Sequence, residues 1–376
     1  MKVIFKDVVK RANTKEDRFN TEKIYYVGGE HIHSNELLIN ERGIIKGSTI
    51  GPMFYFGFKA GQVLFVTRNP HLRKAAMVEF DGICSEKTLV LETMNPSVLS
   101  QDYLPIIMQS DNFWHYCEEH KSGGVNYFIN WSTLADYEFE LPSLEEQHSH
   151  SQKIWAAYRL RESYKKLLAA TDEMVKSQFI EIFYGMETTP VKDYIDDSFP
   201  GEWGTEDKDG NGVKVIRTTN FTNSGKLNLA DVVTRSIEDR KVVRKQIKKY
   251  DTILERSGGT ADNPVGRVVL FEEDNLFLCN NFTQVLRFKD VDPRFAFYAL
   301  YYFYQTNRTA IRSMGSKTTG IQNLNMSKYL EIGIPNASDE DQKAFVTIAE
   351  QADKSEFELK QCIENIDKVI KSLINR

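Results

Sequence analysis

The 376-residue sequence lacks the motifs by which most enzymes are identified. It contains no GxxxxGK[ST] phosphate loop, no GxGxxG dinucleotide loop and no GxSxG nucleophile elbow. Asn95-Pro96-Ser97 falls short of the Asn-Pro-Pro-aromatic motif of amino-methyltransferases, and no FxGxG cofactor motif accompanies it. No apolar run approaches the roughly 20 residues that a membrane-spanning helix needs. We therefore expect neither an integral membrane protein nor a chain with its own catalytic site or cofactor.

Metal-ligand patterns are equally scarce. The four cysteines, Cys84, Cys117, Cys279 and Cys362, show no CxxC spacing and are interpreted as reduced core residues of a cytoplasmic protein. Two histidine pairs, His31/His33 and His148/His150, could each supply two ligands, but no third ligand is evident. We interpret all four as surface histidines and predict no metal site.

The chain also lacks an excess of positive charge. It has 48 basic and 53 acidic residues, a net charge of −5, and both halves have a similar balance. The first residues, Met-Lys-Val-Ile-Phe-Lys, contain no apolar signal core, which agrees with a cytoplasmic location. If nucleic acid is the partner, local basic patches must bind it.

What the sequence does contain is an internal duplication. Cys84 recurs as Cys279 and Gln147 as Gln342, both at a spacing of 195 residues. Near the start of each copy, Phe5-Lys6-Asp7-Val8-Val9 resembles Val191-Lys192-Asp193-Tyr194-Ile195. The spacing is far longer than the roughly 20–50 residues of solenoid repeats. The chain is therefore predicted to be a duplicated module, each copy a globular segment followed by a long helix.

The predicted fold class is α+β, with two mixed globular domains and two long helices. Short strand-like runs broken by Gly, Asn and Pro characterise both globular segments. Ser143 is a suitable N-cap, no Gly or Pro occurs from 145 to 183, and Gly185 ends the helical pattern. The predicted boundaries are a first domain at 1–142, a central helix at 143–185, a second domain at 186–335 and a C-terminal helix at 336–376.

Apolar residues in both helices recur at alternating steps of three and four, which is typical of a coiled-coil seam. We predict that the two helices pack against each other as an antiparallel coiled coil in a pseudo-twofold internal repeat. The alternative is that each helix lies along its own domain. The predicted seam consists of Ile154, Ala157, Tyr164, Leu168, Val175, Ile182, Phe345, Ile348, Ala352, Leu359, Cys362, Ile366, Val369 and Leu373.

Cations cluster at a few places in each copy. Six of them lie between Arg240 and Lys249, just before Tyr250–Gly259, a strand that ends in a Gly-rich turn. Arg68 and Arg256 are assigned to the same strand end in the two copies, and arginine matches guanine edges and phosphates. A solvated basic face is the alternative interpretation. The candidate DNA-binding residues are Arg68, Arg73, Lys74, Arg217, Arg240, Lys241, Arg244, Lys245, Lys248, Arg256 and Lys317.

In these features the chain resembles the specificity subunit of type I restriction–modification systems. The resemblance rests on the duplicated layout, on Asp251-Thr252-Ile253-Leu254-Glu255-Arg256-Ser257-Gly258, on Gly320-Ile321-Gln322-Asn323, and on Leu141-Pro142-Ser143-Leu144-Glu145-Glu146-Gln147. It covers essentially the whole chain. In the first copy, Gly61-Gln62-Val63-Leu64-Phe65 lacks the Ser-Gly that follows Arg256, a departure from the pattern.

The resemblance implies a non-catalytic subunit with two target-recognition domains, each reading one half of a bipartite DNA site. The helices would set the spacing and dock two methyltransferase subunits, which bind S-adenosylmethionine and methylate adenine; restriction and translocase subunits would complete the complex. Two other hypotheses remain open. One is a two-headed coiled-coil scaffold that binds no nucleic acid, and the other is an enzyme acting alone.

Overall fold

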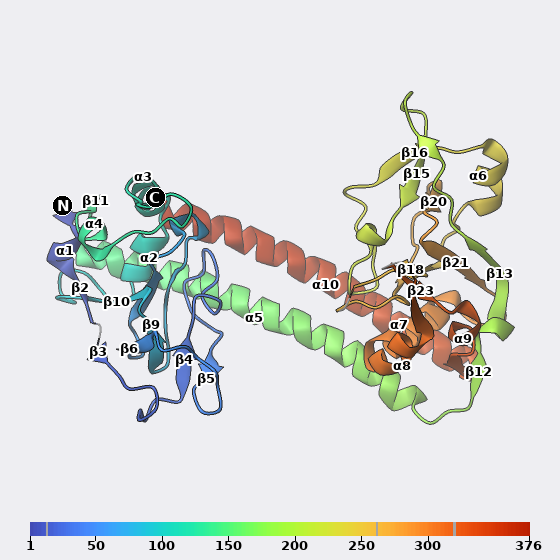
Figure 1. Ribbon diagram of the computed structural model, residues 1–376, viewed down its shortest axis with the longest axis horizontal. Coiled ribbons are helices and arrows are strands. Elements are labelled where there is room, and N and C mark those ends of the chain that lie inside the picture. Colours follow the sequence, from blue (N-terminus) through green and yellow to red (C-terminus); the bar gives the residue numbers. More distant parts are fainter. Residues whose placement is uncertain (13, 261, 319–320) are drawn as a thin grey trace. The chain divides into compact units, whose positions relative to one another are not determined.

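A computed structural model describes residues 1–12, 14–260, 262–318 and 321–376, the side chains of Lys317 and Thr318 excepted. Its contacts divide the chain into two compact units. Unit 1 comprises Met1–Leu168 and Glu358–Arg376, and unit 2 comprises Ala169–Phe357. Two long helices, α5 (Leu144–Phe183) and α10 (Asp339–Ile374), contribute one segment to each unit (Figure 1). The domain boundaries derived from the sequence stay predictions, because they separate the helices from the globular parts.

Both long helices begin at a serine. The Ser143 hydroxyl accepts the Glu146 backbone N–H at 3.3 Å, and the Glu146 carboxylate accepts the Ser143 backbone N–H at 2.8 Å. This reciprocal pair is a capping box, which satisfies two otherwise unpaired amides. Ser338 accepts the Asp341 backbone N–H at 3.1 Å in the same way. Gly185, with φ of +79°, follows α5, as the sequence predicts.

Unit 1 is a mixed α/β unit. Its strands are β1 (Lys2–Ile4), β2 (Val9–Arg11), β3 (Thr14–Lys15), β4 (Tyr25–Val27), β5 (Gly43–Ile44), β6 (Phe54–Phe58), β7 (Val63–Val66), β8 (Ala75–Met77), β9 (Gly82–Ser85), β10 (Thr88–Thr93) and β11 (Glu138–Glu140). Its shorter helices are α1 (Phe5–Val8), η1 (Pro70–Leu72), α2 (Leu104–Gln109), α3 (Asp111–Glu119) and α4 (Trp131–Leu134).

Unit 2 is built from a similar series. Its strands are β12 (Thr188–Pro190), β13 (Ile195–Pro200), β14 (Thr205–Glu206), β15 (Val213–Ile216), β16 (Val233–Ser236), β17 (Thr252–Glu255), β18 (Ser257–Gly258), β19 (Val268–Leu270), β20 (Phe277–Cys279), β21 (Thr283–Phe288), β22 (Gly315–Thr318), β23 (Ile321–Leu324) and β24 (Gly333–Pro335). Its shorter helices are η2 (Val191–Tyr194), η3 (Thr218–Asn220), α6 (Asp239–Lys245), α7 (Pro293–Thr306), α8 (Arg308–Met314) and α9 (Met326–Tyr329).

The central sheets of the two units correspond. The central sheet has the order β2-β10-β7-β8 in unit 1 and β13-β21-β17-β19 in unit 2. In each unit the strand that carries the repeated cysteine pairs in parallel with an earlier strand, so that Cys84 lies opposite Val27 and Cys279 opposite Ile216. The duplication seen in the sequence is therefore a duplication of strand order.

Each central sheet is buried on both faces. Along β7, Val63 and Phe65 face one apolar cluster, whereas Leu64 and Val66 face another. In β17, Leu254 faces one apolar cluster and Ile253 faces another. Successive side chains of a strand point to opposite faces, so continuous apolar runs fit strands with two covered faces.

The two long helices contact each other within each unit. In unit 1, Ile154 of α5 and Ile370 of α10 belong to one apolar cluster. In unit 2, the ring centroids of Phe179 in α5 and Phe345 in α10 lie 5.2 Å apart. Each helix also packs against the globular part of the unit, so its buried face is broader than a two-helix seam.

Three predicted seam positions are wrong in consequence. Ile182 and Val369 are 37% and 51% exposed, and Cys362 is also exposed. The next residue is buried instead in two cases, Phe183 and Ile370. A strict heptad drifts around a straight helix, and packing against the globular part selects the neighbouring residue.

The other cysteines lie in the cores. Cys84, Cys117 and Cys279 are buried, which leaves exposed Cys362 as the exception to the predicted pattern. Burial raises the pKa of the Cys84 and Cys279 thiols to about 12. These two thiols are therefore protonated and unreactive at neutral pH.

Candidate nucleic-acid interface

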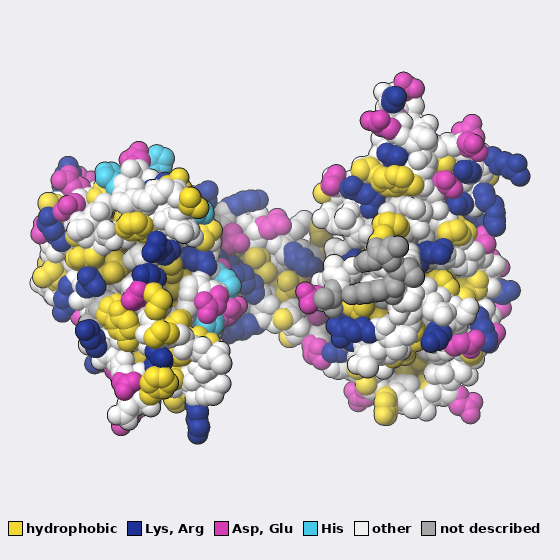
Figure 2. Space-filling model, in the orientation of Figure 1, with side chains coloured by type: hydrophobic (Ala, Val, Ile, Leu, Met, Phe, Trp, Pro, Cys, Tyr) yellow, Lys and Arg dark blue, Asp and Glu magenta, His cyan; other side chains and the backbone are white. Residues whose placement is uncertain are grey.

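The candidate interface of unit 2 centres on helix α6. This helix has no buried side chain, and its one pair of apolar residues includes Val243, which is 80% exposed. Most helices of a globular protein bury an apolar stripe. Lys and Arg side chains gather at the edge of unit 2 where α6 lies (Figures 1 and 2). The outer surface of α6 is thus cationic and exposed.

Acidic residues of unit 2 hold several of these cations in place. The Glu202 carboxylate pairs with Lys245 at 3.0 Å and with Lys241 at 3.4 Å. The hydrogen bond from Lys245 lowers the pKa of Glu202 from its ordinary value. Arg244 pairs with Asp197 at 3.3 Å. These contacts orient the helix without covering its outer face.

Two cations of the basic run are exposed and unpaired. Among the described residues, no hydrogen bond or ion pair involves the side chain of Arg240 or Lys248. An exposed cation without an internal partner is available to neutralise a phosphate. Arg240 and Lys248 are therefore the strongest of the predicted contact residues.

The remaining predicted arginines of unit 2 are engaged inside it. Arg217 donates to the Asp231 carboxylate at 3.1 Å, and Arg256 donates to the Gln284 side-chain oxygen at 3.3 Å. Val66 pairs with Thr88, and Glu255 pairs with Thr283, which is the repeat of Thr88 at the 195-residue spacing. The residues that follow, Thr67 and Arg256, therefore correspond, and Arg68 is one position further along. The predicted equivalence of Arg68 and Arg256 is wrong by one residue, which turns the two side chains to opposite faces of the strand.

The three predicted cations of unit 1 also have internal partners. The Arg68 guanidinium lies 5.2 Å from the ring centroid of Phe128. Arg73 pairs with Asp111 at 2.7 Å, and Lys74 donates to the Gly29 carbonyl at 2.6 Å. These contacts hold the turn after β7 in shape. Lys317 and Gly320 lie outside the residues whose side chains are described, so their predicted role stays a prediction.

Sequence reasoning missed an exposed cationic surface in unit 1. Arg18 stacks on Phe19 at 4.3 Å, and Phe19 is 84% exposed. Together with Lys46 they border a depression of about 580 Å³. Lys46 follows β5, which pairs with β4 as β16 pairs with β15. This surface therefore lies at the sheet edge that corresponds to β16 of unit 2. The place of α6 is taken by β6 in unit 1, because Ile247 bonds to Phe277 of β20 where Phe58 pairs with Gly82 of β9. The adjacent Arg18 and Phe19 in a polar loop were the available signal.

His31 of the first histidine pair lies at a turn of unit 1. His31 accepts the Gly28 backbone N–H through Nδ1 at 2.9 Å, and the Asn220 side chain accepts the Arg217 N–H at the corresponding turn of unit 2. His31 is therefore a turn-forming residue, partly buried and not a surface histidine. Within the described part of the chain, no group of three potential metal ligands occurs. No helix of the described residues is long and apolar enough to cross a membrane.

Part of the chain matches a known protein family. Residues 198–368 match the type I restriction modification DNA specificity domain. The match covers most of unit 2 and includes α6, and it confirms the resemblance inferred from the sequence. A comparison with curated proteins finds no sequence relative.

Two solved structures share the fold over the chain's length. One is a chain from a study of complex assembly and conformational transition in a type I R-M system, with 16% identity, a TM-score of 0.57, and coverage of 100% of this chain and 96% of that one. The other is the S subunit of a type I system from M. genitalium, with 14% identity, a TM-score of 0.57, and coverage of 99% and 95%. At these identities the likeness is one of fold.

Proposed function

We propose that the chain is the DNA-recognition subunit of a type I restriction–modification complex. The observation that carries the proposal is the family match over 198–368, a region that presents the exposed cationic helix α6. Unit 1 repeats the strand order of the central sheet of unit 2 and has an exposed cationic surface of its own beside β5. Each unit would read one half of a bipartite site, with phosphates supplying affinity and base edges supplying specificity.

In this proposal α5 and α10 form an antiparallel coiled coil that relates the units by a pseudo-twofold axis. It would set the spacing between the half-sites and dock two methyltransferase subunits. The methyltransferases would bind S-adenosylmethionine, the chain itself would be non-catalytic, and restriction subunits would join the complete complex. The helix contacts within each unit and the likeness to type I S-subunit folds support this arrangement.

The test is to co-express the chain with its methyltransferase and to sequence the methylome. We expect methylated adenines in a two-part motif with a constant gap. A duplex carrying that motif should bind the purified complex with an affinity that falls steeply with salt. No methylation together with salt-independent or absent binding would contradict the proposal and favour the scaffold hypothesis.

A further inference from the structure

One loop of each unit is fastened to the long helices through ion pairs whose signs are reversed between the units. Two glutamines show which helix positions correspond. The Gln147 side-chain oxygen accepts the Ser100 N–H at 2.9 Å, and that of Gln342 accepts the Asp292 N–H at 2.9 Å. Each amide group also donates to the carbonyl five residues earlier. Fourteen residues further along their helices lie Arg161 and Glu356.

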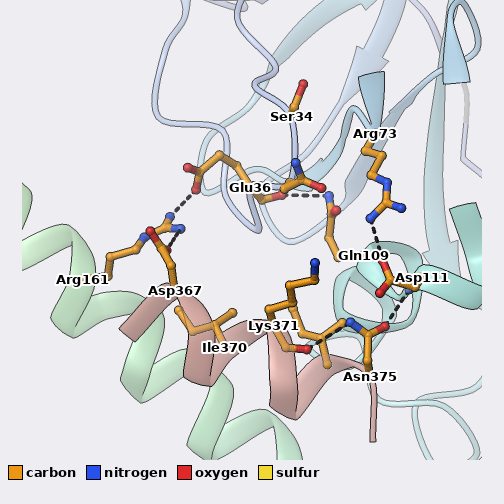
Figure 3. A pocket seen from close by; sticks show the side chains of 12 residues that line it. Ser34, Glu36, Arg73, Gln109, Asp111, Arg161, Asp367, Ile370, Lys371 and Asn375 are labelled. Atoms are coloured by element: carbon orange, nitrogen blue, oxygen red, sulfur yellow. Dashed lines mark hydrogen bonds and ion pairs between the residues drawn. The ribbon is translucent and has the colours of Figure 1, made fainter. Parts of the chain in front are cut away.

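In unit 1, α5 supplies the cations that pair with the loop's Glu36, namely Arg161 and Lys165, and Glu162 of the same helix also pairs with both. Arg161 is 5% exposed and pairs with Glu36 of the loop before β5 and with Asp367 of α10, the latter at 3.0 Å (Figure 3). The Tyr158 hydroxyl donates to the same Glu36 carboxylate at 2.6 Å. The cluster borders a cavity of about 520 Å³, and burial removes most of the screening by water.

In unit 2 the loop supplies the cation and the helix supplies the anions. The Lys226 ammonium lies 2.6 Å from Asp353 and 3.4 Å from Glu356. Glu356 is 5% exposed. Burial alone would lower the pKa of Lys226, but the hydrogen bonds and negative charges of Asp353 and Glu356 together outweigh it and raise the pKa, so the ammonium is charged.

The two loops occupy equivalent places. The Met77 N–H donates to the Leu37 carbonyl at 2.9 Å, and the Leu270 N–H donates to the Gly225 carbonyl at 3.2 Å. Met77 and Leu270 correspond in the sheet registers of β8 and β19. Glu36 precedes Leu37, and Lys226 follows Gly225. The two side chains have opposite charges and contact corresponding helix positions, Arg161 and Glu356.

We propose that these two ion-pair clusters, whose charges are reversed between the units, determine which helix segments each loop packs against. Each cluster favours packing of the loop and its sheet on the helix segments of the same unit. Because the chain is duplicated, the two docking surfaces share their backbone layout, so that layout alone does not distinguish them. Charge supplies the discrimination: Glu36 placed against Asp353 and Glu356 would bring three carboxylates together, and Lys226 placed against Arg161 would bring two cations together. Like charges at partly buried positions disfavour such a pairing.

The test uses the full-length chain without DNA, so its outcome is independent of the proposed function. The reversal K226E is compared with the neutral variant K226M, with E356K and with the double reversal K226E/E356K. We expect K226E to melt roughly 5–10 °C below K226M, because it adds repulsion to a lost pair. The double variant should recover most of this loss, since Lys at 356 would again lie between two carboxylates.

Amide hydrogen exchange gives a local measurement of the same effect. Exchange in residues 222–228 should accelerate in K226E and return towards the wild-type rate in the double variant. In unit 1, E36K should melt below E36Q for the corresponding reason. Equal melting of K226E and K226M, or no recovery in the double variant, overturns the proposal. If K226E does not fold, a folded double variant supports the proposed role of the charge pairing, and an unfolded double variant refutes it.

Discussion

At the scale of single residues, local sequence does not show which cations are free. Arg73, Lys74, Arg217 and Arg256 look as available in the sequence as Arg240, yet each has an internal partner. Their partners lie between 14 and 45 residues away along the chain. The basic run could be predicted, but the division between structural and accessible cations depends on tertiary contacts.

This division leads to a prediction for DNA binding. R240A/K248A should weaken binding of the methylated motif by the complex and reduce the slope of log affinity against log salt by about 2, since two phosphate contacts are lost. The matched control is K192A, which removes another exposed cation of unit 2, paired with Glu331 away from α6. Fluorescence anisotropy at several salt concentrations measures both quantities. An equal loss in K192A would assign the effect to net charge alone.

Acid sensitivity is expected at Asp292, the N-cap of α7. Burial would raise the pKa of Asp292, but the hydrogen bonds and positive charge of Arg294, with the Phe295 N–H, together outweigh it and lower the pKa below its ordinary value of 3.8. The stabilisation is therefore complete above about pH 4 and is lost as the pH falls through the lower value in the folded protein. D292N should cost about 1 kcal/mol at pH 7 and progressively less below pH 4. Urea unfolding at both pH values, with D209N as the exposed control, measures the difference.

At the scale of elements, the sequence predicts starts and stops well. Ser143, Ser338 and Gly185 mark helix ends because capping depends on residues within one turn. Strand runs such as Val63–Val66 are also predictable, since both of their faces are apolar. The precise buried stripe of the long helices was less predictable, because packing against the globular parts selects Phe183 and Ile370 over their neighbours.

The repeated glutamines give a prediction at this scale. Gln147 is fully buried and links the start of α5 to Ser100, Val98 and Pro142. Q147A would leave a buried N–H unpaired, which costs about 1–3 kcal/mol in the free energy of unfolding. Q342A should behave alike in unit 2, and the exposed Gln152 provides the matched control on α5. Chemical denaturation tests this, and equal stability of Q147A and Q152A would refute the anchoring role.

At the scale of the whole molecule, the duplication has a mechanical consequence if the chain reads a two-part site. Removing Leu167–Ala170 from α5 and Leu359–Cys362 from α10 would shorten each helix by about 6 Å, close to two base pairs of DNA. We expect the half-site sequences to stay the same and the gap between them to shrink. Methylome sequencing gives both results at once. An unchanged gap would show that the helices do not set the spacing.

The sequence by itself determined the repeat, the two long helices, the mixed α/β class and the absence of catalytic motifs. These features rest on periodicity, capping and composition, which act over a few residues or are counted directly. Only the tertiary structure decided which cations remain exposed, where the cationic surface of unit 1 lies, and that Arg161 and Glu356 pair with loop residues of opposite charge at corresponding helix positions. The ion pairs of Arg161 with Glu36 and of Glu356 with Lys226 join residues more than 100 positions apart, so no local sequence pattern predicts them.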